Sequence, residues 1–306
     1  MCLMIKDKYI DPFTDFGFKH IFGTEENKRF LISFLNDLLN LDDKIVDITY
    51  RNLEKLGLNI IDRKAIFDVF CTDEKNNNFI VELQRSQQKY FKDRSVYYTS
   101  FPIQAQSKKG DWDYRLTQIY FIGILEFTFD DMRLKQNQQS DKYLSKVQLF
   151  DCDEKSVFYD KLTYYYLEMP KFRKKEEELA THLDYWLYYL NNLANTIKIP
   201  SVLKEDKLLQ EAFDVAEFLA LDKDEQFSYQ QDLKARWDNK ACLDYAEEKG
   251  FEQGMEKGME KGMEKGIKNE KIEIAKNLLK ARLEINFISQ TTGLTTQEIK
   301  KLSIKS

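Results

Sequence analysis

Two short apolar runs separated by a polar turn constrain the fold of this 306-residue chain more than any other feature. Residues 65–71 read AIFDVFC and residues 79–84 read FIVELQ, and both are rich in apolar and β-branched side chains. The residues between them, TDEKNNN, are typical of a turn. The pattern therefore predicts a β-hairpin with strands at 65–71 and 79–84.

The alternation within this hairpin places two acids and an amide on one face. Side chains point to opposite faces along a strand, so the apolar neighbours of Asp68, Glu82 and Gln84 point into a core while these three point away from it. If the hairpin is symmetric about Lys75, Asp68 lies directly opposite Glu82, with about 5 Å between their Cβ atoms.

Two carboxylates at that separation repel each other unless a cation lies between them. Carboxylate oxygens suit Mg²⁺ or Mn²⁺, which lower the pKa of a bound water and polarise a phosphoryl oxygen. The amide of Gln84 could hold that water or a phosphate. The spacing alone leaves a second interpretation open, in which Asp68 and Glu82 are exposed acids on a solvated strand face.

The rest of the chain indicates a mixed α/β unit followed by helices. We expect an amphipathic helix capped by Thr24, a second hairpin after a long strand, a helix interrupted at Pro102, and helices throughout 175–249. The expected segments are a helix at 25–40, strands at 45–50 and 116–129, a helical pattern at 87–109, and hairpin strands at 143–150 and 157–169. We predict three parts: a core at 1–172, a helical region at 173–249, and a repeat with a small basic hairpin at 250–306.

A glycine recurs every four residues in GFEQGMEKGMEKGMEKG, from Gly250 to Gly266. Each glycine inside a helix costs about 1 kcal/mol relative to alanine. Two interpretations stay open: a solvated, partly helical spacer, or a close-packed helix through which copies of the chain form a homo-oligomer. Spacing of four residues rotates the glycine row by about 40° per repeat, which favours the spacer.

The C-terminal segment, residues 267–306, is basic, with a net charge of +4. Its sequence FISQTTGLTTQEIKKL predicts helix, glycine turn and helix, with Thr295 or Thr296 as the second cap. Lys300 and Lys301 on the second helix could contact DNA, although a helical hairpin that merely packs on its neighbours is the more economical interpretation.

Composition excludes several classes of protein. The net charge of −5 excludes a uniformly basic nucleic-acid binder but not a local basic patch. The four scattered cysteines and two histidines, His20 and His182, exclude a zinc cluster and favour a reducing cytoplasm. The longest apolar run, residues 119–129, is too short to span a membrane and contains Glu126, so membrane insertion is not expected.

With these residues in view, the segment DRKAIFDVFCTDEKNNNFIVELQRS resembles the Asp…Glu-x-Gln hairpin of the PD-(D/E)XK nuclease superfamily. It is most similar to the Rpn family of recombination-promoting nucleases, also called PD-(D/E)XK family transposases. The segments DPFTDFGFKHIFG, RSVYYTS and KKGDWDYRLTQIYFIGIL, and the glycine repeat with its TTGL end, extend the resemblance over nearly the whole chain.

The resemblance implies a mixed central sheet flanked by helices and a Mg²⁺- or Mn²⁺-dependent DNA endonuclease. Asp68 and Glu82 would be metal ligands and Gln84 would take the place of the usual lysine, whose charge it lacks. It also makes Asp15 a candidate additional acid, with Lys19 beside it as an ion-pair partner or phosphate contact. Basic residues after the hairpin could meet a DNA backbone, namely Arg85, Lys89, Lys92 and Arg94.

Two classes of function remain at this stage. The first is a metal-dependent endonuclease linked by family resemblance to recombination, mobile DNA or defence. The second is a catalytically degenerate DNA-binding or assembly protein built on the same core. The intact pair of Asp68 and Glu82 favours catalysis.

Overall fold

The computed structural model describes residues 8–51, 67–107, 113–129 and 141–303. The chain divides into two compact units, residues 1–234 and 235–306. The first unit contains the sheet and the second contains three helical segments. Lys64, a basic residue near the hairpin, lies outside the described residues.

Six strands form one mixed sheet, in agreement with the α/β fold expected from the sequence. The order is β1-β2-β3-β4-β6-β5, with parallel pairing of β4 to both β3 and β6 and antiparallel pairing elsewhere. The strands are β1 (Ile48–Tyr50), β2 (Val69–Asp73), β3 (Asn78–Gln84), β4 (Ile119–Leu125), β5 (Leu144–Asp151) and β6 (Ser156–Glu168).

The register of the first hairpin is the one predicted. Val69 pairs with Val81 and Thr72 with Asn78, so the next pair outward is Asp68 with Glu82. Strand β2 begins at Val69, later than expected, and Asp68 lies immediately before it. The Asp73 carboxylate closes the turn by accepting from the backbone N–H groups of Lys75 and Asn77, at 2.9 and 2.8 Å.

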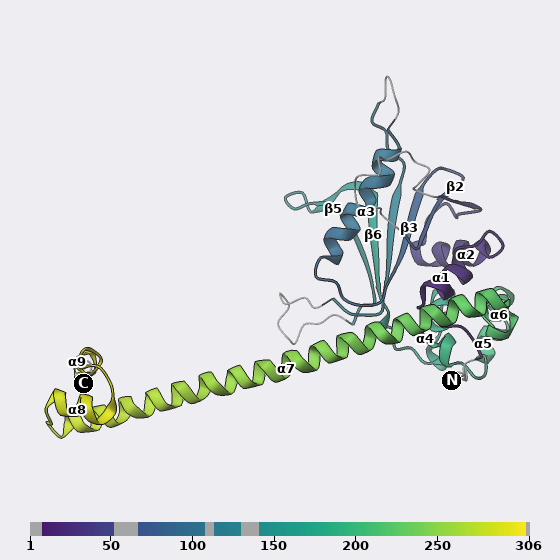
Figure 1. Cartoon of the computed structure of the whole chain (residues 1–306). Coiled ribbons are helices and arrows are strands. Elements are labelled where there is room, and N and C mark those ends of the chain that lie inside the picture. Colours follow the sequence, from purple (N-terminus) through teal and green to yellow (C-terminus); the bar gives the residue numbers. More distant parts are fainter. Residues whose placement is uncertain (1–7, 52–66, 108–112, 130–140, 304–306) are drawn as a thin grey trace. The chain divides into compact units, whose positions relative to one another are not determined.

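Helices cover both faces of the sheet (Figure 1). One face packs on α1 (Asp15–Phe22), α2 (Lys28–Leu39), α4 (His182–Asn192) and α6 (Lys207–Val215) to form the main core. The other face lies under α3 (Phe91–Ala105), where Phe91 packs with Phe121 and Tyr166. The alternating pattern of β3 thus places apolar side chains in two separate cores, with Val81 on one side and Ile80 on the other.

Two local expectations at the helices are wrong. Thr24 does not cap α2, which starts at Lys28 after Asn27. Pro102 does not interrupt α3, although it removes one backbone hydrogen bond near the end of that helix. Pro102 is buried, so packing against the sheet outweighs the missing bond.

The remaining helices follow the sheet in the chain. Helix α7 (Lys223–Lys280) runs without a break through the glycine repeat, and no neighbouring atom lies within 4 Å of an added Cβ at any of the five repeat glycines. No helix within the described part of the chain is long and apolar enough to cross a membrane. The helices that follow the sheet, besides α4 and α6, are α5 (Ser201–Lys204), α7 (Lys223–Lys280), α8 (Ile285–Thr292) and α9 (Thr296–Ser303). Short 3-10 turns lie at Met169–Lys171, Glu176–Glu178, Leu193–Asn195 and Phe218–Ala220.

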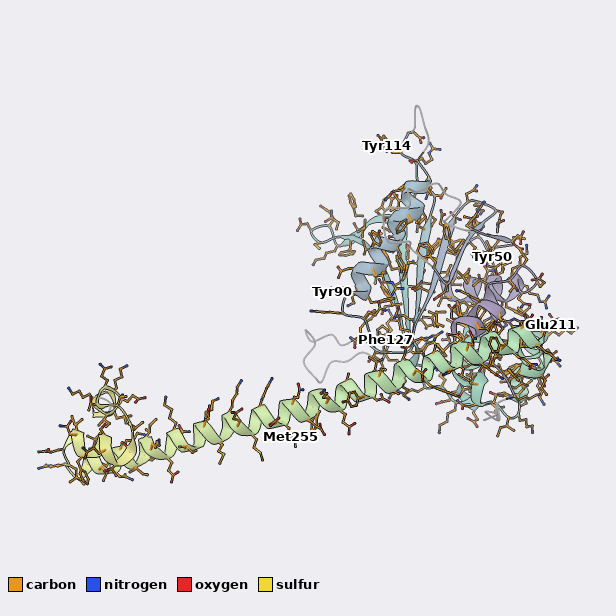
Figure 2. All side chains as sticks on the ribbon, viewed as in Figure 1. Tyr50, Tyr90, Tyr114, Phe127, Glu211 and Met255 are labelled. Carbon is orange, nitrogen blue, oxygen red and sulfur yellow. The ribbon has the colours of Figure 1, made fainter. Side chains whose placement is uncertain are left out.

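The second unit has its own small core. Ile288 of α8 and Ile299 of α9 pack against Ala275 near the end of α7. Gly293 ends α8 in the left-handed conformation, with φ 70°, and Thr295 caps α9, so the predicted helix, glycine turn and helix are confirmed. Upstream, Met255 is labelled in Figure 2 and is 64 % exposed, one of a row of exposed apolar side chains at four-residue spacing.

A charged clasp holds three helices of the first unit together. His182 of α4 contacts Asp37 of α2 through Nδ1 and the Asp206 carboxylate through Nε2, at 2.9 Å for the second contact. Asp206 also caps α6 by accepting from the Leu209 N–H. The hydrogen bond and charge of Asp37, with a smaller contribution from Asp206, raise the pKa of His182 above its usual 6.5.

This clasp predicts a pH-dependent contribution to stability. Because the folded-state pKa is raised, the contribution is fully present below about pH 6.5 and is lost as the pH rises through the folded value. The substitution His182→Asn should lower the free energy of unfolding by about 1–3 kcal/mol at pH 5.5, and by less at pH 8.5. Urea denaturation at the two pH values measures the difference, and an equal loss at both would contradict a charged clasp.

Candidate active site

The side chains of Glu82 and Gln84 lie under α3 rather than on a solvated face. They share the face of β3 that carries Ile80, and they are only 3 % and 7 % exposed. The interpretation of Glu82 as an exposed surface acid is therefore wrong. It fails because α3 covers the second face of the sheet, which alternation within one hairpin does not reveal.

Asp68 is fixed against β3 by its own side chain. Its Oδ2 accepts a hydrogen bond from the backbone N–H of Leu83 at 2.6 Å, just before β2 begins. The acid is half-buried. The register and this bond together hold the Asp68 carboxylate beside Leu83, the residue that follows Glu82 in β3.

The two carboxyl groups influence each other's ionisation. Burial, with the charge of Asp68 as the second cause, raises the pKa of Glu82 to about 8, against the opposing effect of Arg94. Burial likewise raises the pKa of Asp68 to about 6, opposed by its bond to Leu83. A cation between the two acids would stabilise their charged forms.

The guanidinium of Arg94, on α3, reaches into this acid pair. One terminal nitrogen contacts Glu82 Oε1, and the other lies 3.3 Å from Gln84 Oε1. Gln84 in turn donates from Nε2 to the carbonyl of Ser86 at 3.0 Å. Glu82 Oε2 is buried and has no hydrogen-bond partner in the described part of the chain.

An open cavity of about 730 Å³ is lined by Asp68 and by Asp15 and Lys19 of α1. Lys19 Nζ lies 3.0 Å from Asp15 Oδ2, the ion pair expected from their i,i+4 spacing. The charge of Asp15 raises the pKa of Asp68 and that of Lys19 lowers it. The structure therefore brings all three residues to one place, while Glu82, whose carboxyl group interacts with the charge of Asp68, lies under α3.

Helix α7 supplies a wall of this cavity that the sequence did not reveal. Asp232 accepts from the backbone N–H of Phe16 at 2.9 Å and lies 3.5 Å from the guanidinium of Arg85. Glu225, Ser228 and Gln231 line the same cavity. The available signal was the acid-rich start of a helix after residue 222, but nothing in the sequence connects it to α1 across more than 200 positions.

The other predicted basic residues are placed as follows. Lys89 lies over the ring of Tyr90, with 5.3 Å between Nζ and the ring centre. Lys92 lies over the ring of Phe129 at 4.6 Å. Lys300 and Lys301 belong to α9 in the second compact unit.

The acid pair fits a hard divalent cation that keeps several water ligands. Mg²⁺ is commonly bound by one or two carboxylates, with water or phosphate oxygens completing its shell. Asp68 and Glu82 offer two carboxylates, and the buried Oε2 of Glu82 still lacks a partner among the residues described. Within those residues, no group of three or more His, Cys, Asp or Glu side chains forms a complete metal cage.

Comparison with known proteins identifies a family. A family model described as PD-(D/E)XK nuclease family transposase matches residues 12–246, which include the hairpin, α3 and the start of α7. No curated protein and no solved structure matches the chain significantly. On the family model, which covers well over half of its length, the chain belongs to the PD-(D/E)XK nuclease family of transposases.

Proposed function

We propose that this protein is a Mg²⁺-dependent DNA endonuclease that hydrolyses phosphodiester bonds. The observation that carries the proposal is the buried Glu82 beside Asp68, with one carboxylate oxygen left without a partner in the described residues. Burying a carboxylate is costly unless something compensates it. Arg94 compensates Glu82 through Oε1 only, and a divalent cation suits the remaining Oε2 together with the Asp68 carboxylate.

Asp68 and Glu82 would hold the cation. A bound Mg²⁺ supplies a polarised phosphoryl oxygen and a water of lowered pKa. The Leu83 N–H keeps the Asp68 carboxylate in place, and the cover of α3 limits the access of bulk water to Glu82. Gln84 would contribute through its amide, which already contacts Arg94 and the carbonyl of Ser86.

DNA would approach on the side of the open cavity. Lys19 and Asp15 lie there beside Asp68, where a phosphate contact or a further metal ligand is useful. Arg85, Lys89 and Lys92 follow the hairpin and would contact the DNA backbone, as would Lys300 and Lys301 of α9. We propose a cytoplasmic role in recombination, mobile DNA or defence, in keeping with the free thiols of Cys71, Cys152 and Cys242.

A second function is favoured by one observation, the glutamine at position 84. Glutamine carries no charge to stabilise a developing phosphorane. On this alternative, the chain binds DNA or assembles with other copies without cutting. The exposed row of Phe251, Met255, Met259 and Met263 on α7 would then serve a homo-oligomer.

Metal binding should be visible in thermal stability and should depend on pH. Because the folded-state pKa values of Asp68 and Glu82 are raised, the contribution of these two groups to metal-free stability is greatest below about pH 4 and is lost as the pH rises through about 6 and 8. Mg²⁺ needs the charged forms, so its stabilising shift of Tm should grow over the same pH range. Scanning calorimetry at pH 5.5, 7 and 8.5 measures both trends. Each scan is made with and without about 10 mM Mg²⁺, a concentration chosen to exceed the dissociation constant of a weak site.

The variant Asp68→Asn keeps an acceptor for the Leu83 N–H but loses the charge. It should remove the Mg²⁺-dependent shift and should equal or exceed the metal-free stability of the native protein at pH 8.5. Glu211→Gln is the matched control, an exposed acid paired with Arg29 on the far side of the main core from α3. A Mg²⁺ shift that persists unchanged in Asp68→Asn would remove this site from consideration.

Cleavage itself is tested with plasmid DNA and Mg²⁺. Asp68→Ala should lower the rate by about 100-fold or more, because a metal ligand is lost, whereas Glu211→Gln should cut at the native rate. Gln84→Ala should lower turnover without weakening DNA binding, and Gln84→Lys should retain or raise it. Absence of cutting by the native protein, together with retained DNA binding, would favour the non-catalytic alternative.

Removal of the residues from Gly250 onward tests the role of the C-terminal segment. The truncated chain keeps the sheet and the cavity wall at Asp232, so cutting at saturating DNA should survive. The loss of eleven basic side chains, eight of them within residues 267–306, should weaken binding and reduce the salt slope by about 0.9 for each phosphate contact removed. An unchanged slope with a smaller assembly mass in sedimentation would instead identify this segment as an oligomerisation element.

A further inference from the structure

Arg94 is held in one position by four different side chains. Its terminal nitrogens contact Glu82, Gln84 and Gln88, and its Nε donates to the hydroxyl of Tyr98 at 2.8 Å. The guanidinium carbon lies 4.9 Å from the centre of the Tyr98 ring. An arginine fixed in this way loses little further freedom when it acts on a ligand, which is the usual requirement for a preorganised cationic group.

The other basic side chains whose charge acts on the acid pair are paired with acids of their own. Lys19 pairs with Asp15, and Arg85 pairs with Asp232. Arg94, by contrast, contacts the acid pair directly through Glu82. Its side chain is 30 % exposed, so this residue is only partly covered by the surrounding protein.

The glutamine at position 84 leaves the proposed reaction in need of a cationic side chain from elsewhere. Hydrolysis of a phosphodiester adds negative charge to the nonbridging oxygens in the transition state, and Gln84 has no charge to offer. The Arg94 guanidinium lies 3.3 Å from the Gln84 amide oxygen, so the positive charge stands beside the end of β3 although it comes from α3.

We propose that Arg94 is a catalytic residue that contacts a nonbridging oxygen of the scissile phosphate and supplies the positive charge that Gln84 lacks. This inference rests on the proposed nuclease function. In the reaction, the water oxygen forms a bond to phosphorus and the bond from phosphorus to the leaving sugar oxygen breaks. The water gives up one proton to solvent, and the leaving oxygen gains one proton from solvent. Arg94 keeps all its protons throughout, because a guanidinium does not deprotonate in proteins.

In this structure, Glu82 contacts a guanidinium nitrogen that a phosphate oxygen would use. If Glu82 held a divalent cation, its carboxylate would be compensated and the Arg94 nitrogen would be available to the substrate. Gln88 and Tyr98 would keep the rest of the guanidinium in place during this exchange.

The test compares Arg94→Gln and Arg94→Lys with the native protein in single-turnover cleavage at saturating plasmid and Mg²⁺. Arg94→Gln should lower the rate by about 100-fold or more while the DNA dissociation constant changes by less than about 5-fold. Added guanidinium ion at millimolar concentration should restore part of the rate, which a purely structural arginine would not permit. Arg29→Gln, which breaks an exposed pair with Glu211, is the matched control and should cut normally.

Each outcome decides between the alternatives. A native rate in folded Arg94→Gln, or a reduced rate that guanidinium ion does not restore, would overturn the proposal. If Arg94→Gln fails to fold, Arg94→Lys decides, since it retains the charge. An Arg94→Lys cleavage rate at least tenfold above the rate of Asp68→Asn supports the proposal. An Arg94→Lys rate as low as the rate of Asp68→Asn overturns it. Failure of the native protein to cut would instead reject the nuclease function itself.

Discussion

The register between β2 and β3 is the constraint on which the site depends. A slip of one residue would transfer every side chain of β3 to the opposite face and move Glu82 from beneath α3 into the main core. The Asp73 carboxylate helps to fix this register, because it accepts hydrogen bonds from the backbone N–H groups of Lys75 and Asn77 within the turn. Asn76 completes the turn in the left-handed conformation, with φ 60°, which asparagine tolerates better than most residues.

The burial of Glu82 places an ionisable carboxyl group where its charged form is unfavourable. Its charged form is disfavoured by burial and by Asp68, and it is favoured by Arg94. An arginine that compensates the acid in the free protein also places a positive charge where a phosphate would need one. The same side chain thus serves the stability of the free protein and, on our proposal, the reaction.

Much of the hairpin could be predicted from the sequence because its information is local. The apolar runs, the turn residues and the symmetry about Lys75 are sufficient to place Asp68 opposite Glu82. The burial of Glu82 could not be predicted in this way, because α3 lies outside the hairpin and covers the face that alternation marks as non-core. Pro102 gives a further reason, since a proline within a helical pattern argues locally against the continuous helix that the structure shows.

Asp232 illustrates the second kind of information that a single sequence lacks. It binds the backbone of α1 and the side chain of Arg85, which are separated from it by more than 140 positions. Tyr229, one turn earlier on α7, accepts from the backbone N–H of Asp11 at 2.9 Å. The start of α7 therefore fixes α1, and with it Asp15 and Lys19, relative to the end of β3. The helix whose glycine repeat favours a solvated spacer is, in its first turns, part of the wall of the candidate active site.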